Sequence, residues 1–283
     1  TGGSVRIPAS ATGTVGLKPT FGRWSNAGIV PLGISFDTPG ILTRSAADAA
    51  FAFAELDGTR VPEITDAAGL RIGLGEPFFW EATSPGIAEC VKEALGLAET
   101  AGAALSDATL PGCAEVFDLY HRGGIIASEL YALIRTRLPA WLETLDPRVR
   151  RRMDAGKSLE AWEYLERKAK YAELATGAAK ALSAIDALVT PTVPITPPPI
   201  ADLANDDTYA RLNMLALRNT CVVSFLGLCA ITIPAGRDAA GMPVGLQLIG
   251  APGSEPRLLA IARLFERLLD RRGRWSPPCG ITD

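Results

Sequence analysis

Short apolar runs alternate with longer amphipathic stretches along most of the chain. Runs rich in β-branched and aliphatic residues predict strands, and they cover residues 12–18, 28–31, 70–74, 103–107 and 185–190. Apolar positions at helical spacing predict helices over residues 46–56, 86–101, 209–219 and 257–269. Residues 114–180 are predicted to be mostly helical, with breaks near Pro139 and Pro147.

The order of these elements predicts the fold class. A strand at 70–74, a helix at 86–101 and a strand at 103–107 suit a right-handed βαβ crossover in a parallel or mixed sheet. Two β-rich runs, 224–236 and 241–250, are separated by a short polar turn and predict a hairpin. We therefore expect an α/β fold with a mixed, mostly parallel central sheet flanked by helices.

The charged helix near residues 159–180 has a regular row of large apolar side chains. They are spaced so that they share one face, as Leu159, Trp162, Leu165, Tyr171 and Leu174. Such a face is more typical of core packing than of a binding stripe.

Composition excludes several classes of protein. A hydrophobic content of 48% with 21% charged residues is ordinary for a globular protein, and a net charge of −3 gives no reason to expect nucleic acid binding. Five widely spaced cysteines and one histidine, His121, argue against a disulfide framework, a zinc site and a Ser-His-Asp triad. The cysteines favour a reducing, cytoplasmic setting, and no apolar run approaches the length of a membrane span.

The chain begins with two glycines that lead directly into a serine, Thr1-Gly2-Gly3-Ser4. Glycine allows successive backbone N–H groups to point at one spot. A hydroxyl at the end of such a loop can attack a carbonyl while those N–H groups hold the developing oxyanion. On these four residues alone, an ordinary Gly-Gly-Ser turn is the simpler interpretation.

The following forty residues change that interpretation. Residues 1–9 (TGGSVRIPA), 16–23 (GLKPTFGR) and 35–40 (SFDTPG) together resemble the amidase signature family. Only Ile41 departs clearly, at a position where that family usually has proline. The resemblance implies an amidase-signature fold and a Ser–cis-Ser–Lys hydrolase.

Several site assignments follow from the resemblance. It implies that Ser4 is the acyl-forming nucleophile and that the backbone N–H groups of Thr1, Gly2 and Gly3 form the oxyanion hole. The family's general-base lysine and bridging cis-serine lie upstream of this loop, and Lys18 belongs to a structural element instead. We therefore expect residues 1–283 to be one amidase domain, the C-terminal portion of a longer chain, and to be inactive alone.

Other polar residues have structural and functional interpretations. Arg6 could bind a substrate carboxylate, but a structural tie to the sheet is favoured, and Asp37 and Gln247 are also expected to be structural. The proline-rich segment 191–199 fits either a rigid linker or, as the resemblance favours, a loop that lines the cleft. We expect residues 78–80, 115–142 and 191–200 to set specificity, but the sequence does not identify substrate-binding residues.

The predicted function is hydrolysis of a small-molecule carboxamide, with no cofactor, no metal and no membrane or nucleic acid partner; a homodimer is compatible. One alternative is the glutaminase component (the A subunit) of a tRNA-dependent amidotransferase, although Ile7 stands where that subclass usually has glutamine. The other is an inactive binding protein on the same fold, which would not need an intact Gly2-Gly3-Ser4 loop.

Overall fold

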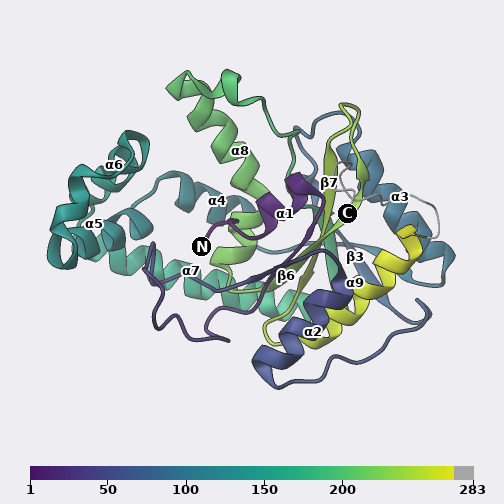
Figure 1. The fold of residues 1–283 in the computed structure, drawn as a ribbon. Helices are drawn as coiled ribbons and strands as arrows, with labels where there is room; N and C mark the ends of the chain where they lie inside the picture. Colours follow the sequence, from purple (N-terminus) through teal and green to yellow (C-terminus); the bar gives the residue numbers. More distant parts are fainter. Residues whose placement is uncertain (271–283) are drawn as a thin grey trace.

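A single mixed sheet organises the structure, a computed structural model that describes residues 1–270 (Figure 1). Cys279, one of the five cysteines considered above, lies outside the described residues. The strand order is β2-β1-β6-β7-β5-β3-β4. The strands are β1 (Val15–Lys18), β2 (Ile41–Thr43), β3 (Arg71–Gly75), β4 (Ala104–Ala108), β5 (Ala187–Pro191), β6 (Cys229–Arg237) and β7 (Pro243–Gly250).

The sheet is mixed, but the expectation that it is mostly parallel is wrong. Only β3 pairs in parallel, with β4 and with β5, while β2–β1, β1–β6, β6–β7 and β7–β5 are antiparallel. The predicted hairpin is confirmed as β6 and β7, and its short connection permits only antiparallel pairing. The parallel part is the predicted crossover, β3–α3–β4.

Helices supply the remaining layers. The α-helices are α1 (Arg6–Thr12), α2 (Ala46–Asp57), α3 (Ile87–Thr100), α4 (Cys113–His121), α5 (Ile125–Arg137), α6 (Pro147–Asp154), α7 (Ala161–Leu182), α8 (Asp206–Phe225) and α9 (Glu255–Asp270). Short 3₁₀ turns are η1 (Pro77–Phe79), η2 (Pro139–Glu143), η3 (Ala155–Ser158) and η4 (Ile200–Leu203). The predicted breaks near Pro139 and Pro147 are confirmed, because η2 and α6 begin there.

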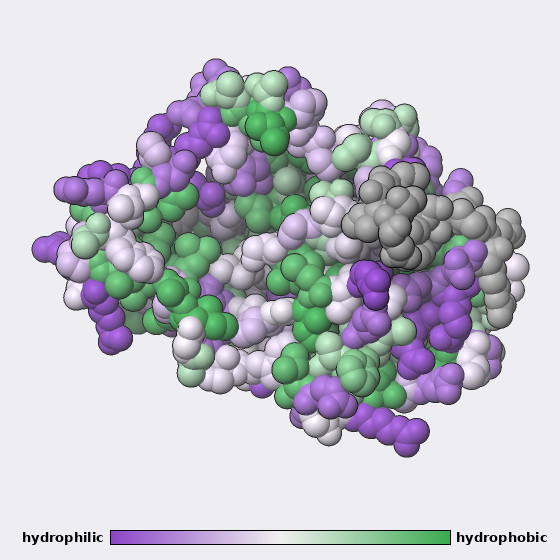
Figure 2. All heavy atoms as spheres, viewed as in Figure 1, coloured by the Kyte–Doolittle hydropathy of each residue, from purple (hydrophilic) through white to green (hydrophobic). Residues whose placement is uncertain are grey.

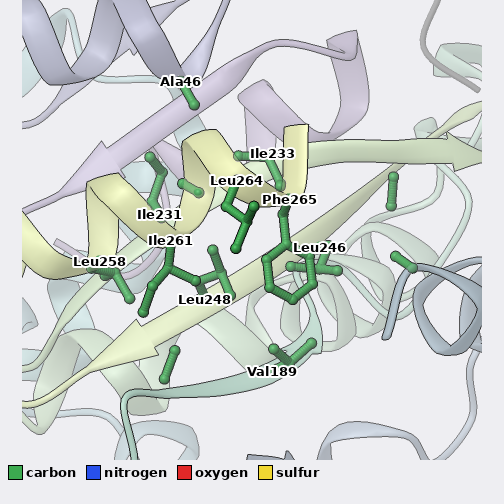
Figure 3. Packing of buried hydrophobic residues seen from close by; sticks show 14 of the residues in the cluster. Ala46, Val189, Ile231, Ile233, Leu246, Leu248, Leu258, Ile261, Leu264 and Phe265 are labelled. Carbon is green, nitrogen blue, oxygen red and sulfur yellow. The ribbon is translucent and has the colours of Figure 1, made fainter. Parts of the chain in front are cut away.

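The sheet separates two hydrophobic clusters. Helices α2, α3 and α9 cover one face, and α1, α4, α7 and α8 lie on the other, while α5 and α6 form a lobe at one side (Figure 1). Figure 3 shows Leu258, Ile261 and Phe265 of α9 packed over Leu246 and Leu248 of β7.

Side-chain alternation leaves a row of polar residues on the opposite face. Leu246 and Leu248 point into the α9 cluster, so Gln247 between them points toward α1. Thr190 of β5 and Thr232 of β6 are in register with Gln247 on either side. All three are fully buried.

Helix α1 lies unusually close to this polar row. A Cβ at Gly16 would come within 2.8 Å of the Cβ of Ala9, and one at Gly245 within 2.4 Å of the Oγ of Ser10. Side chains at these two positions would push the helix away from the sheet. The Oγ of Ser10 also accepts a hydrogen bond from the N–H of Gly245 at 3.0 Å.

In the first forty residues, one predicted strand is confirmed only in part and another is absent. The predicted strand at 12–18 begins only at Val15, because the chain first forms α1, which ends at Gly13 in the left-handed region (φ 70°). Residues 28–31 form no strand, because Gly28 turns the chain there with φ 83°. The edge strand is instead β2, at residues 41–43.

Tertiary burial overrides local preference in α7 and α8. Helix α8 extends to Phe225 instead of ending at residue 219, although its last residues are β-branched and aromatic, because this stretch is buried on all sides. In α7, Tyr171 is buried as predicted, but Trp162 and Leu165 are 64% and 66% exposed. The prediction that these two residues pack in the core is wrong, because the first turns of α7 extend beyond the sheet.

Leu248→Ala should lower the free energy of unfolding by about 2–5 kcal/mol, because it leaves a cavity between β7 and α9. Leu248 is fully buried, whereas Leu42 on the edge strand is 55% exposed. Leu42→Ala is therefore the matched control, with an expected loss below about 1 kcal/mol. Urea unfolding measures both; equal losses would contradict this assignment of the core.

Candidate active site

The loop of residues 1–4 precedes α1 directly and places Ser4 at the surface. Ser4 is exposed, Gly3 is buried, and the carbonyl of Gly3 accepts a hydrogen bond from the N–H of Ile7 at 2.9 Å. Among residues 1–270, no side chain hydrogen-bonds to the Ser4 hydroxyl. The nearest lysine in sequence, Lys18, donates instead to the carbonyl of Pro19 at 2.7 Å.

The buried end of α8 forms the wall behind this loop. A Cβ at Gly3 would lie 2.3 Å from the Oγ1 of Thr220, and one at Gly2 would lie 3.4 Å from the Cδ2 of Leu217. Larger residues at Gly3 would therefore collide with α8. The contact explains why this position is glycine without invoking a left-handed backbone.

Arg6 fixes α1 against both α8 and the sheet. Its guanidinium donates to the Oε1 of Gln247, to the carbonyl of Thr220 at 2.9 Å and to the Oγ of Ser224 at 2.7 Å. The side chain is fully buried, and burial lowers the pKa of Arg6 to about 9. Its acceptors are neutral, and its Nε has no hydrogen-bond partner within the described residues. The structural interpretation of Arg6 and Gln247 agrees with these contacts.

Gln247 joins Arg6 to a longer buried network. Its Nε2 donates to the Oγ1 of Thr190 at 3.0 Å and to the carbonyl of Asn219 at 3.3 Å. The Nδ2 of Asn219 in turn donates to the carbonyls of Phe79 and Pro191, at 2.9 and 2.8 Å. The network thus extends from α1 through β7 to the segment at 78–80, which the sequence associates with specificity.

Asp37 connects the irregular segment at residues 32–38 to Thr1, the first residue of the loop. Its Oδ1 accepts a hydrogen bond from the Oγ1 of Thr1. Its Oδ2 accepts from the backbone N–H groups of Leu32 and Gly33, at 2.8 and 3.0 Å. These contacts agree with the expected structural role of Asp37, and its hydrogen bond with Thr1 is an addition that the sequence did not reveal.

Lys18 belongs to a second buried group of charges. Burial, with a smaller contribution from the charge of Arg6, lowers the pKa of Lys18 to about 7. Arg23 forms ion pairs with Asp57 at 2.6 Å and with the buried Glu255 at 2.9 Å, and Glu255 also accepts from the N–H of Thr20 at 2.6 Å. These contacts attach the segment 18–23 to α9, in agreement with a structural role.

Within the described residues, the histidine and the cysteines contribute nothing to the hydrogen-bond networks around Ser4 described above. His121 is an exposed residue at the end of α4. Residues 1–270 contain no group of three or more His, Cys, Asp or Glu side chains that could hold a metal ion, and none of their helices is long and apolar enough to span a bilayer. Cys113, Cys221 and Cys229 are buried within this part and form no disulfide.

The segment at 191–199 is packed against the body of the protein. The carbonyl of Pro194 accepts from the N–H of Ser84 at 2.8 Å, and the hydroxyl of Thr196 donates to Asp238. These ties rule out a free linker. Figure 2 shows a hollow in the face between the α5–α6 lobe and the upper end of α8, with hydrophobic residues along it, and Figure 1 places the N-terminus on this face.

Comparison with known proteins identifies the family. A family model described as Amidase matches residues 1–259. The chain therefore belongs to the Amidase family, as its first forty residues suggested.

Individual relatives point to two kinds of enzyme. The chain is 47% identical over 273 residues to a 2-amino-5-chloromuconic acid deaminase of Comamonas testosteroni, covering 95% of this chain and 59% of that protein. It is 31% identical over 304 residues to the A subunit of the glutamyl-tRNA(Gln) amidotransferase of Geobacter sp. (strain M21), covering 94% and 62%.

Solved structures agree on the fold. The crystal structure of an amidase matches with a TM-score of 0.82 at 29% identity, covering 95% of this chain and 61% of that one. The corresponding amidotransferase polypeptide from Thermotoga maritima matches with a TM-score of 0.76 at 27% identity, covering 98% and 63%. The chain thus spans about three-fifths of the length of these relatives.

Gln247→Leu should lower the free energy of unfolding by about 2–3 kcal/mol, because it removes an acceptor from a buried guanidinium. The matched control is Thr232→Val, which removes the buried hydrogen bond between the hydroxyls of Thr232 and Thr192, 2.5 Å apart. It should lower the free energy of unfolding by about 1 kcal/mol. Denaturant unfolding at pH 7 measures both. A smaller loss for Gln247→Leu than for Thr232→Val would contradict the importance of the Arg6 contact.

Lys18→Met should stabilise the protein more at pH 6.5 than at pH 9.5. The folded-state pKa of Lys18, about 7, lies below its unfolded value of about 10.4, so burial of the charged form costs stability fully below pH 7 and progressively less up to pH 10.4. The advantage of the variant should therefore be constant below about pH 7 and shrink above it, by on the order of 1.4 kcal/mol per pH unit up to about pH 10.4. Melting temperatures across this range test it, and a constant difference would contradict it.

Proposed function

We propose that the complete protein hydrolyses a C–N bond through an acyl-enzyme on Ser4. Membership of the Amidase family supports this, together with an exposed Ser4 at the end of a loop that α1, α8 and Asp37 hold in place. The observation that carries the proposal is this combination: a serine whose hydroxyl has no side-chain partner among residues 1–270, on a backbone that α8 and Asp37 hold in place. A flexible turn would lack the preorganisation that oxyanion stabilisation requires.

The proposed reaction has two steps. The Oγ of Ser4 attacks the carbonyl carbon and loses its proton to a base. The N–H groups of Thr1, Gly2 and Gly3 stabilise the tetrahedral oxyanion, and the C–N bond breaks as ammonia or an amine takes up a proton. Water then hydrolyses the ester to release the acid and restore Ser4.

The base is proposed to be a lysine acting through a cis-serine, both supplied by a part of the protein preceding Thr1. This agrees with two features of the described residues: the Ser4 hydroxyl has no side-chain partner, and Lys18 is engaged with Pro19. Residues 1–283 alone are then expected to turn over little substrate.

The relatives suggest where to look for the substrate. The 47% identity to a 2-amino-5-chloromuconic acid deaminase favours a hydrolase that releases ammonia from a small acid over the amidotransferase function, whose example is 31% identical. Ile7, in place of the glutamine usual in amidotransferases, points the same way. A substrate panel should therefore include simple carboxamides, glutamine with and without a tRNA-binding partner, and 2-amino-5-chloromuconic acid. The amino group of the last compound is on a vinylic carbon and not on a carbonyl, so release of its ammonia would not pass through an acyl-enzyme on Ser4 and would contradict the two-step reaction proposed here.

Ser4→Ala in the complete protein should abolish labelling by a fluorophosphonate probe and lower kcat at least about a thousandfold, because no other group replaces the nucleophile. The control is Ser106→Ala, which changes an exposed serine on edge strand β4 and should leave both unchanged. Mass spectrometry of the labelled peptide identifies the modified residue.

Absence of label on Ser4 in the folded, complete protein would refute the enzyme proposal and favour an inactive binding protein. Glutaminase activity that appears only with a tRNA-binding partner protein would instead support the amidotransferase. Robust amide hydrolysis by residues 1–283 would contradict the upstream base.

A further inference from the structure

The segment 32–38 is an irregular stretch that contacts the loop of residues 1–4 through Asp37. It closes on itself, because the N–H groups of Phe36 and Asp37 both donate to the carbonyl of Gly33 at 2.9 Å. The carbonyl of Asp37 accepts from the Nδ2 of Asn26 at 2.9 Å. Three hydrogen bonds thus hold the backbone of the turn that carries Asp37.

Aromatic packing anchors this segment to the core. The ring of Phe36 is buried and lies 4.6 Å from the ring of Phe225 in α8 and 5.2 Å from that of Tyr171 in α7. Phe225 also faces the loop, since a Cβ at Gly2 would be 4.0 Å from its Cζ. The same side chain therefore supports both the segment and the loop.

A carboxylate of the helical lobe adds a second anchor. The carboxylate of Glu129 in α5 accepts hydrogen bonds from the hydroxyl of Ser35 and from the backbone N–H of Ser35, the latter at 3.1 Å. It also accepts one from the hydroxyl of Tyr164 in α7 at 2.7 Å. Burial, and then this bond to Glu129, raise the pKa of Tyr164, so its proton stays in place at neutral pH. The segment is fixed to α5 and α7 as well as to α8.

Asp37 divides its two oxygens between this segment and the loop. One accepts the two N–H groups at residues 32 and 33, and the other accepts the hydroxyl of Thr1. In the complete protein, Thr1 would carry the first of the backbone N–H groups assigned to the oxyanion hole. The side chain of Thr1 is held by the hydrogen bond from its hydroxyl to Asp37. A backbone donor that must hold its place within a fraction of an ångström benefits from such a tie.

We propose that Asp37 is a positioning residue for the oxyanion hole, acting through the hydroxyl of Thr1. This inference rests on the proposed function of the loop and adds a residue that would not touch substrate. The alternative is that Asp37 only closes the turn at 32–37, in which case the hydroxyl of Thr1 would be dispensable.

The test changes that hydroxyl and leaves the turn intact. In the complete protein, Thr1→Val removes the donor, while Thr1→Ser keeps it. We expect Thr1→Val to slow the limiting rate of Ser4 labelling by a fluorophosphonate about 10- to 100-fold, with the half-saturating probe concentration changed less than about threefold. Thr1→Ser should label at close to the unsubstituted rate.

A double-mutant cycle completes the experiment. Asp37→Ala removes the acceptor of the Thr1 hydroxyl together with the acceptor of the two N–H groups in the turn, so it should slow labelling at least as much as Thr1→Val. The double variant should be no slower than Asp37→Ala, because the Thr1 interaction is already lost there. Asp48→Asn, an exposed carboxylate in the first turn of α2, is the charge control and should have no effect.

Each outcome has a distinct meaning. Labelling of Thr1→Val at the unsubstituted rate, a failure of Thr1→Ser to restore it, or additive effects of the two changes would overturn the inference and leave the proposed function standing. No labelling of the unsubstituted protein at Ser4 would refute the proposed function itself. Matched melting temperatures of Thr1→Val and Thr1→Ser establish that the comparison reports position and not folding.

Discussion

The burial of one unpaired guanidinium constrains the rest of the structure. Among residues 1–270, no carboxylate pairs with the buried Arg6, and its hydrogen-bond acceptors there are neutral oxygens. These oxygens belong to β7 and α8, so α1 must lie where the two elements meet. The glycines of β1 and β7 leave room for it there. Because residues 1–4 lead directly into α1, the same constraint places Ser4.

The candidate site is a rigid frame around a short loop. The end of α8 stands behind Gly2 and Gly3, and the polar row centred on Gln247 lies beneath α1. Asp37 adds a hydrogen bond to Thr1 from the segment 32–38, which contacts α5, α7 and α8. Hydrolysis at a carbonyl needs donors that do not reorganise as charge develops, and a loop held on three sides suits that demand.

Local signals predicted the elements that they control. Apolar spacing predicted α2 over residues 46–56, and the strand–helix–strand spacing predicted the parallel crossover of β3 and β4. The motif around Ser4 identified the family, which the match over residues 1–259 confirms. The role of Ser4 and of the loop N–H groups stays a prediction.

The sequence by itself determined the family, most element positions and the serine on which the proposed chemistry depends, because these are written in short motifs and local propensities. The tertiary structure alone decided that α8 continues through its β-branched end, that Trp162 is exposed, and that the sheet is mostly antiparallel. It also decided that Arg6 is buried against Gln247 and α8 and that Asp37 reaches Thr1. Each of these features depends on which surfaces from distant parts of the chain pack together. That packing is decided by the burial of apolar side chains and by the pairing of buried polar groups, which local sequence does not specify.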